Sequence, residues 1–193
     1  MGLKDLASRF KVKQPSPKPI RVVSDESVQI FYHALPDIRA KAIYLTYASS
    51  GLRRTEVKKL GLSDIDLKTG MIIANHSTKT KNSWITFVNN ETLEVLKEYL
   101  KQRGNEDGRL FKMSEEAFKD MWSQTKEITG IDITPQKLRE QFCDKMGRLG
   151  VQERYIDAFC GRIAKSILAR HYTDYSPERL KQIYDQADLR VLE

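Results

Sequence analysis

Apolar residues recur at helical spacing over most of the chain, a pattern typical of amphipathic helices that each bury one face. One helix is predicted over residues 24–35 and a second over residues 37–50, where Gly51 suits a left-handed C-terminal cap. A short helix follows, with Val57 and Leu60 turned inward. The start of the globular region is therefore expected to be helical.

The pattern changes in the middle of the chain. The segments MIIANH (71–76) and SWITFVN (83–89) are rich in β-branched and aromatic residues, and the polar run between them is typical of a turn. A β-hairpin is predicted here, with Lys79 and Lys81 at its tip.

Helical spacing resumes after the hairpin, often behind a capping residue. A further helix is predicted to run up to Tyr172, and the others are expected to begin near Asn90, Ser114, Thr134, Glu153 and Pro177. Strands confined to the middle and helices elsewhere predict a mainly helical (α+β) domain with a small antiparallel β-hairpin.

Two of these helices have an apolar stripe that can be followed to its end. The helix from Ser114 is expected to bury Ile128 in line with Phe118 and Trp122. The helix from Thr134 is expected to bury Leu149 and to end at Gly150.

The first residues have a different composition. Residues 1–23 combine six Lys and Arg residues with Pro15, Pro17 and Pro19, which favours an extended backbone over a packed element. We therefore expect a basic arm over residues 1–23, either a solvated tail or a DNA contact, and one domain over residues 24–193 that closes with a helix.

The net charge of the chain indicates the class of its partner. The 193 residues include 33 Lys and Arg against 26 Asp and Glu, a net charge of +7, and the pI is near 9.3. An excess of cations favours a polyanionic partner, most simply nucleic acid, although a basic protein without such a partner has the same charge.

The cysteines and the hydropathy indicate the cellular compartment. Cys143 and Cys160 are the only cysteines and lie beside apolar residues, so we expect them to be small core residues of an intracellular, cytoplasmic protein. No apolar run approaches the ~18 residues of a membrane-spanning helix, and no signal-peptide core precedes the domain, so no membrane partner is expected.

A tyrosine lies in a polar turn near the end of the chain. Tyr172 is flanked by Arg170, His171 and Thr173, where its phenol could serve as a nucleophile. Tyr172 and Tyr175 are also spaced as two rings on one helix face that pack into a core.

Five segments favour the interpretation of Tyr172 as a nucleophile. In chain order they are SSGLRRTEV, STKTKNSWITFV, TPQKLREQF, AFCGRI and LARHYTDYSPERL. They resemble the successive motifs of the tyrosine recombinases, or integrases, most closely those of archaeal virus and plasmid integrases. The similarity covers about residues 24–190 and implies the helical catalytic domain of that family. Such enzymes normally carry a separate core-binding domain ahead of the catalytic one, and residues 1–23 are too short to contain it, so the chain is expected to be a catalytic part.

The resemblance implies a set of catalytic residues. The first catalytic arginine is Arg53, with Glu56 as the acid that orients it, and the hairpin lysine is Lys79, with Lys81 as the alternative. The nucleophile is Tyr172, with Tyr175 as the alternative.

The resemblance departs from the family pattern at two positions. In the usual His-x-x-Arg box the arginine is Arg139, but Gln136 replaces the histidine, and neighbouring Lys137 is a further cation. In the usual Leu-Gly-His box, Arg162 follows Cys160 and Gly161. No histidine is therefore expected to act as the general base at either position.

The chemistry that the resemblance implies requires neither metal nor ATP, and no cofactor is expected. A tyrosine hydroxyl attacks a DNA phosphodiester and forms a 3′-phosphotyrosyl bond, while a lysine protonates the departing 5′-oxygen. A free phenol has a pKa of ~10, so nearby arginines are needed to favour the phenolate and to bind the phosphate oxygens.

Duplex DNA is the expected partner, with further cations contacting its phosphates. The candidates are Lys58, Lys59, Lys81, Lys137, Arg148 and Lys165. Assembly as a tetramer on DNA is expected, with the helix after Pro177 docking on a neighbouring protomer or packing on its own domain. Two other functions remain open: DNA relaxation of the type IB topoisomerase kind, and DNA binding without catalysis.

Overall fold

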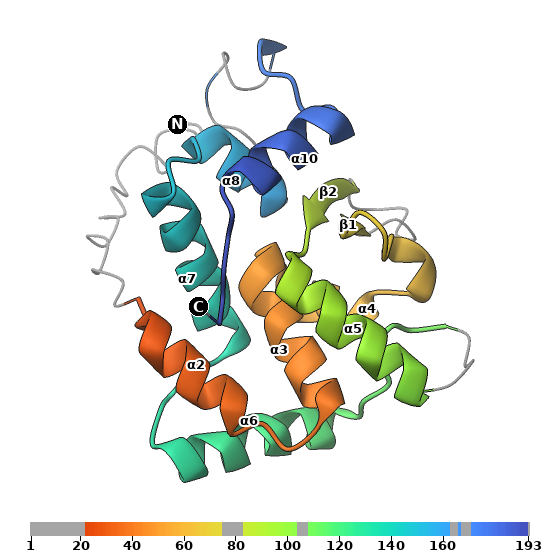
Figure 1. The fold of residues 1–193 in the computed structure, drawn as a ribbon, viewed down its shortest axis with the longest axis vertical. Helices are drawn as coiled ribbons and strands as arrows, with labels where there is room; N and C mark the ends of the chain where they lie inside the picture. The colour runs from red at the N-terminus through yellow and green to blue at the C-terminus, as the bar shows by residue number, and fades with distance from the viewer. Residues whose placement is uncertain (1–21, 75–82, 104–107, 163–165, 167–170, 193) are drawn as a thin grey trace, which may run out of the picture.

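The computed structural model describes residues 22–74, 83–103, 108–162, 166 and 171–192. Helices dominate, and two short strands lie in the middle of the chain (Figure 1). In chain order the elements are α2 (Asp25–His33), α3 (Ile38–Ser50), α4 (Arg54–Lys59), the 3₁₀ turn η1 (Leu62–Asp64), β1 (Met71–Ala74), β2 (Trp84–Phe87), α5 (Asn90–Arg103), α6 (Glu115–Thr129), α7 (Pro135–Arg148), α8 (Glu153–Phe159) and α10 (Pro177–Gln186).

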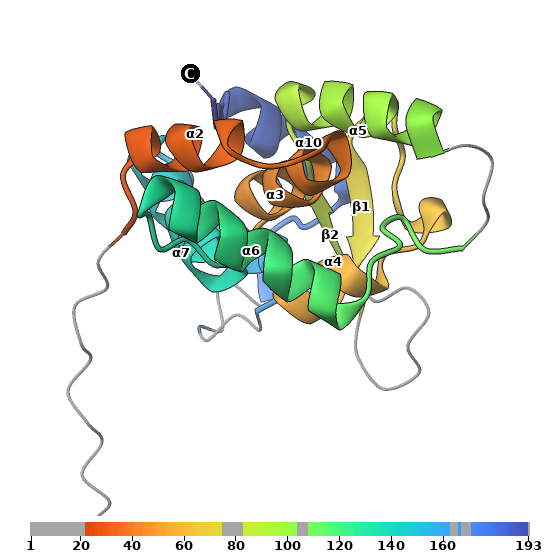
Figure 2. The same ribbon diagram turned by 90° about the horizontal axis from the view of Figure 1, so that it is seen from below.

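Helix α3 is the centre of the domain. It packs against α5 and α7, and Figures 1 and 2 show it surrounded by the other helices. Its buried polar residues satisfy themselves locally, because the hydroxyls of Thr46 and Ser49 donate to the carbonyl oxygens of Ala42 and Leu45, both at 2.7 Å. A helix with polar residues can therefore occupy the core.

The strands pair antiparallel, with Met71 opposite Phe87 and Ala74 opposite Trp84. Helices α8 and α10 lie against β2. The predicted hairpin is confirmed where the structure describes it, while its tip, with Lys79 and Lys81, lies outside the described residues.

The apolar core forms two clusters. The larger one gathers side chains of α2, α3, α5 and α6, and the smaller one lies between β2, α8, α10 and the second half of α7. Helix α7 contributes Leu138 to the larger cluster and Phe142 and Met146 to the smaller one. The two clusters therefore meet along α7.

Two predicted core residues are wrong. Ile128 is 73% exposed because it lies in the last turn of α6, beyond Met121, Trp122 and Thr125 on the buried face. Leu149 is 43% exposed because α7 ends at Arg148, and Leu149 is its C-terminal cap.

Helix α10 packs on its own domain, which answers one alternative left open by the sequence. Leu180, Ile183 and Ala187 are buried, and the Tyr184 hydroxyl donates to the Ser49 carbonyl oxygen at 2.7 Å. Within the described part of the chain, no helix has both the length and the apolar surface needed to cross a bilayer.

Candidate active site

Arg53 lies at the turn between α3 and α4. Gly51 ends α3 with φ +66°, in the left-handed region, and Arg53 is the N-cap of α4. The carboxylate of Glu56, which is buried, accepts the Arg53 backbone N–H at 2.6 Å and its Nη1 at 2.8 Å. Glu56 thus orients both the start of α4 and the guanidinium of an arginine side chain that is 47% exposed.

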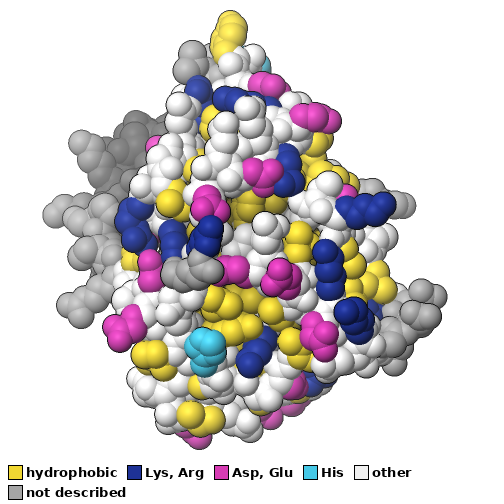
Figure 3. Space-filling view, viewed as in Figure 1, with side chains coloured by type: hydrophobic (Ala, Val, Ile, Leu, Met, Phe, Trp, Pro, Cys, Tyr) yellow, Lys and Arg dark blue, Asp and Glu magenta, His cyan; other side chains and the backbone are white. Residues whose placement is uncertain are grey.

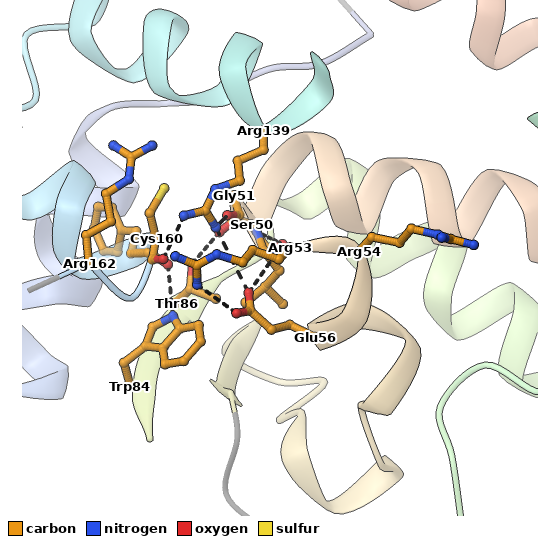
Figure 4. A network of polar contacts seen from close by, with 12 residues as sticks. Ser50, Gly51, Arg53, Arg54, Glu56, Trp84, Thr86, Arg139, Cys160 and Arg162 are labelled. Atoms are coloured by element: carbon orange, nitrogen blue, oxygen red, sulfur yellow. Dashed lines mark hydrogen bonds and ion pairs between the residues drawn. The ribbon is translucent and has the colours of Figure 1, made fainter. Parts of the chain in front are cut away.

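Arg139 reaches the same turn from α7 (Figure 4). Its buried guanidinium donates from Nη1 to the Gly51 carbonyl oxygen and from Nη2 to the Cys160 carbonyl oxygen at 2.9 Å. The Glu56 carboxylate lies 4.0 Å away. Arg139 therefore joins the α3–α4 turn to the end of α8.

Positive charge is concentrated around Arg139. Burial lowers its pKa, and the nearby guanidinium groups of Arg53 and Arg162 act in the same direction. Arginine remains protonated in proteins because its ordinary pKa is above 12. The site therefore holds three permanent positive charges close together.

The turn after α8 presents Arg162. Gly161 has φ +60°, and a Cβ on it would lie 2.3 Å from the indole ring of Trp84. Trp84 in turn donates from Nε1 to the Phe159 carbonyl oxygen at 3.1 Å. Glycine is therefore required where strand β2 supports this turn.

Two partners hold the Arg162 side chain, which is 45% exposed. Nη1 donates to the Asp157 carboxylate at 3.1 Å, and Nη2 points to the Cys143 sulfur at 3.6 Å. The sequence did not single out these two partners for a role at the site. The Asp157 spacing, five residues before Arg162, is the signal that could have indicated the first.

Comparison with known proteins shows the family of this chain. The model of the phage integrase family matches residues 21–179, most of the chain. The chain belongs to the phage integrase family.

Relatives of this integrase chain include a tyrosine recombinase XerA from Pyrococcus furiosus, which is 27% identical over 202 residues that cover 97% of this chain and 69% of the relative. A crystal structure of XerA recombinase has a TM-score of 0.68 at 24% identity and covers 91% of this chain and 68% of that one. A structure of XerH recombinase bound to its difH substrate has a TM-score of 0.62 at 16% identity, covering 90% and 56% of the two chains. The integrase is a tyrosine-type recombinase with the family's catalytic fold.

The structure places the integrase's two candidate tyrosines differently. Tyr172 is 78% exposed, and within the described residues no hydrogen bond joins its hydroxyl to the arginines. Tyr175 is half-buried, and its ring packs edge-on against Tyr155 with centroids 6.0 Å apart. Its hydroxyl oxygen is buried and has no hydrogen-bond partner among the described residues. Tyr175 therefore has the environment of a packing residue.

Gln136 has no hydrogen bond to the three arginines within the described residues. It is exposed, and its Nε2 donates to the Glu140 carboxylate at 2.9 Å on the outer face of α7. Lys79, the candidate general acid, lies outside the described residues. The structure therefore brings together Arg53, Arg139 and Arg162 and leaves Gln136 apart from them.

Three of the candidate phosphate contacts already have acidic partners. Lys58 pairs with Glu115, Lys137 pairs with Asp132 at 2.5 Å, and Arg148 contacts Asp144 at 2.8 Å. Lys59 is exposed, while Lys81 and Lys165 lie outside the described residues. The face drawn in Figure 3 likewise mixes acidic and basic side chains. In the described part of the chain, no group of three His, Cys, Asp or Glu side chains could hold a metal ion.

Proposed function

We propose that this recombinase cleaves and rejoins duplex DNA at Tyr172, with the scissile phosphate held by the arginine cluster. The observation that carries the proposal is the chain of contacts that connects Arg53, Arg139 and Arg162 from three separate elements, through Glu56 on one side of Arg139 and through Cys160 and Cys143 on the other. Rigid guanidinium donors held before substrate binds are the arrangement that stabilises charge on a phosphoryl group in its transition state.

The three arginines have different tasks in this proposal. Arg53 and Arg162 are each almost half exposed, and within the described residues each has N–H groups that are not hydrogen-bonded to protein and that could bind non-bridging phosphate oxygens. Arg139 is buried, and two of its N–H groups donate to backbone carbonyl oxygens. It therefore contributes positive charge and holds the α3–α4 turn and the turn after α8 in place.

The reaction exchanges one phosphoester bond for another, so the number of these bonds does not change. The Tyr172 hydroxyl gives its proton to solvent, and its oxygen attacks phosphorus and forms the 3′-phosphotyrosyl bond. The bond to the 5′-oxygen breaks at the same time, and that oxygen takes a proton from Lys79. Attack by another strand's 5′-hydroxyl reverses the step, so no ATP is consumed. Loss of one preorganised donor is expected to slow cleavage by about 10² to 10³-fold.

The nucleophile is tested with a nicked suicide DNA substrate that traps the covalent adduct. The wild-type chain should give an SDS-resistant protein–DNA band, and Tyr172→Phe should abolish it. Tyr175→Phe is the matched control and should retain the band. An adduct that persists in Tyr172→Phe but disappears in Tyr175→Phe would reverse the assignment.

Duplex DNA is the proposed partner, and a tetramer on DNA is the proposed assembly. The net charge of +7 and the exposed arginines support phosphate contact. Because each phosphate contact releases counterions, affinity should fall steeply between ~50 and ~200 mM salt. Nearly constant affinity over this range, measured by fluorescence anisotropy with labelled duplex, would argue against DNA.

Two narrower proposals rest on the sequence alone. The motifs favour an integrase of an archaeal virus or plasmid, and residues 1–23 are proposed to be a basic arm that leads into the catalytic domain. The first is tested by integration of a circular DNA that carries a candidate attachment site into archaeal host DNA. The second is tested by removal of residues 1–23, which should weaken duplex binding while adduct formation persists.

A further inference from the structure

The chain's only two cysteines meet beside the arginine cluster. Cys143 lies on α7 and is half-buried, Cys160 follows α8 and is fully buried, and their sulfur atoms are 3.5 Å apart. A disulfide has an S–S distance of about 2.05 Å, so an approach of about 1.5 Å would close the bond. Neither cysteine has a part in the proposed strand-cleavage chemistry.

Both cysteines are in non-covalent contact with arginines of the cluster. Arg162 Nη2 lies 3.6 Å from the Cys143 sulfur, and Arg139 Nη2 donates to the Cys160 carbonyl oxygen at 2.9 Å. Figure 4 shows Cys160 between the two guanidinium groups. Cations next to a partly accessible sulfur are the surroundings in which a thiolate forms and reacts.

The two thiols differ in acidity. A hydrogen bond from Cys160, together with the positive charges of Arg162 and Arg139, lowers the pKa of the Cys143 thiol. The same hydrogen bond and burial raise the pKa of the Cys160 thiol. Cys143 is therefore the attacking sulfur, and Cys160 is a protonated partner in contact with it.

We propose that Cys143 and Cys160 are an oxidisable pair, which a hydroperoxide closes to an intramolecular disulfide that disturbs the arginine cluster. The Cys143 thiolate attacks a peroxide oxygen, the O–O bond breaks, and a sulfenic acid forms while hydroxide leaves and takes up a proton. The Cys160 sulfur then displaces the sulfenic oxygen, which leaves as water with the Cys160 proton. With hydrogen peroxide, two thiols become one disulfide and the peroxide becomes two molecules of water.

The effect on the site follows from what the cysteines touch, and this step rests on the proposed function. Closing the bond removes the thiolate from Arg162 and shifts the backbone whose carbonyl oxygen holds Arg139. A displacement of ~1 Å in a catalytic group can slow a reaction by about 10²-fold. DNA cleavage by the oxidised chain is therefore expected to be at least about tenfold slower and to recover with dithiothreitol.

The bond is tested without DNA. The full chain is treated with hydrogen peroxide, and free thiols are titrated after denaturation, beside intact mass and non-reducing electrophoresis. Both thiols should disappear with the mass loss of two hydrogen atoms, without a covalent dimer, and dithiothreitol should restore them. In Cys160→Ser, which keeps a hydrogen-bond donor beside Cys143, the sulfenic acid on Cys143 should be trapped by dimedone, whereas in Cys143→Ser the buried Cys160 thiol should survive.

Several outcomes would overturn the proposal. Survival of both wild-type thiols, or a disulfide formed only between chains, would show that the pair does not close. A closed bond with unchanged adduct formation, or equal peroxide sensitivity in Cys143→Ser, would show that the pair does not control the site. If the reduced chain forms no adduct, the proposed function fails, and the thiol titration alone decides whether the pair exists.

Discussion

Two buried tyrosine hydroxyls in this domain differ in their hydrogen bonding. The Tyr184 hydroxyl donates to the Ser49 carbonyl oxygen, and full burial is the main cause that raises its pKa above the ordinary value. In the part of the chain that the structure describes, the buried Tyr175 hydroxyl oxygen has no hydrogen-bond partner. A buried unpaired polar group costs free energy that a paired one recovers.

The two tyrosines therefore predict opposite responses to loss of the hydroxyl. Tyr184→Phe should lower the free energy of unfolding by about 1–2 kcal/mol, because its hydrogen bond is lost. Tyr175→Phe should leave it unchanged or raise it by up to about 1 kcal/mol, because a desolvated hydroxyl is removed. Urea unfolding of both variants measures the difference, and a large loss in Tyr175→Phe would mean that its hydroxyl has a partner.

Glu56 is a second residue with a testable role, since its carboxylate orients Arg53 and lies near Arg139. Glu56→Gln keeps the shape but removes the charge, so we expect a loss of about 1–3 kcal/mol in unfolding free energy. Adduct formation should fall by up to about 10²-fold as Arg53 loses its orientation. Glu115→Gln removes an exposed partner of Arg54 outside the network, and adduct formation that falls equally there would contradict the assignment.

At the scale of elements, the site depends on how helices end. The left-handed Gly51 turns the chain from α3 to Arg53, and Gly161 does the same between α8 and Arg162. At both positions a Cβ would meet a ring, that of Phe142 at 2.6 Å or that of Trp84 at 2.3 Å. The helix ends are therefore fixed by backbone conformation and by close packing together.

Gly161→Ala separates these two causes when it is compared with Gly130→Ala. Gly130 has φ +69° and open space around its Cβ position, so its substitution should cost only the ~1–2 kcal/mol of a left-handed alanine. Gly161→Ala should cost more, because the Trp84 ring must also move. Chemical unfolding of the two variants measures the costs, and equal values would show that the contact with Trp84 is unimportant.

At the scale of the whole molecule, the last described residues return to the first half of the domain. The Glu91 carboxylate on α5 accepts the backbone N–H groups of Val191 at 2.7 Å and Leu192 at 3.1 Å, and the Val191 side chain is buried in the larger core cluster. The Asn89 side chain donates to the Leu189 carbonyl oxygen at 3.0 Å. The chain after α10 is thus part of the folded domain.

Loss of the Glu91 contacts should lower the stability of the whole domain. Glu91→Ala is expected to lower the free energy of unfolding by about 2–3 kcal/mol, because two partly buried N–H groups lose a charged acceptor. Glu94→Ala, an exposed position one turn later, should stay within about 0.5 kcal/mol. Thermal or urea unfolding decides, and equal stability of the two variants would show that the tail contributes little.

Local chemistry made part of this fold predictable from sequence. Thr134 and Ser176, each followed by proline, cap α7 and α10 as expected, because caps depend on neighbouring residues. The exposure of Ile128 could not be predicted, since it depends on where the neighbouring elements stop covering α6.

The arginine cluster was only partly predictable. The motifs indicated Arg53, Arg139 and Arg162, and the three side chains do meet. The attachment of Arg139 to the Cys160 carbonyl oxygen, 21 residues along the chain, depends on tertiary packing that no local pattern records.

The division of the core into two clusters has a consequence for motion. Arg53 follows α3 in the larger cluster, Arg162 follows α8 in the smaller one, and Arg139 lies on α7, which belongs to both. Proteins open in cooperative units that often coincide with such clusters, and amide hydrogen exchange resolves them. If α8 and α10 exchange as one unit ahead of α3, the three positive charges separate each time that unit opens. The lifetime of the assembled site is then set by the weaker half of the domain, and DNA that bridges both halves would slow exchange in α8 and α10 more than in α3.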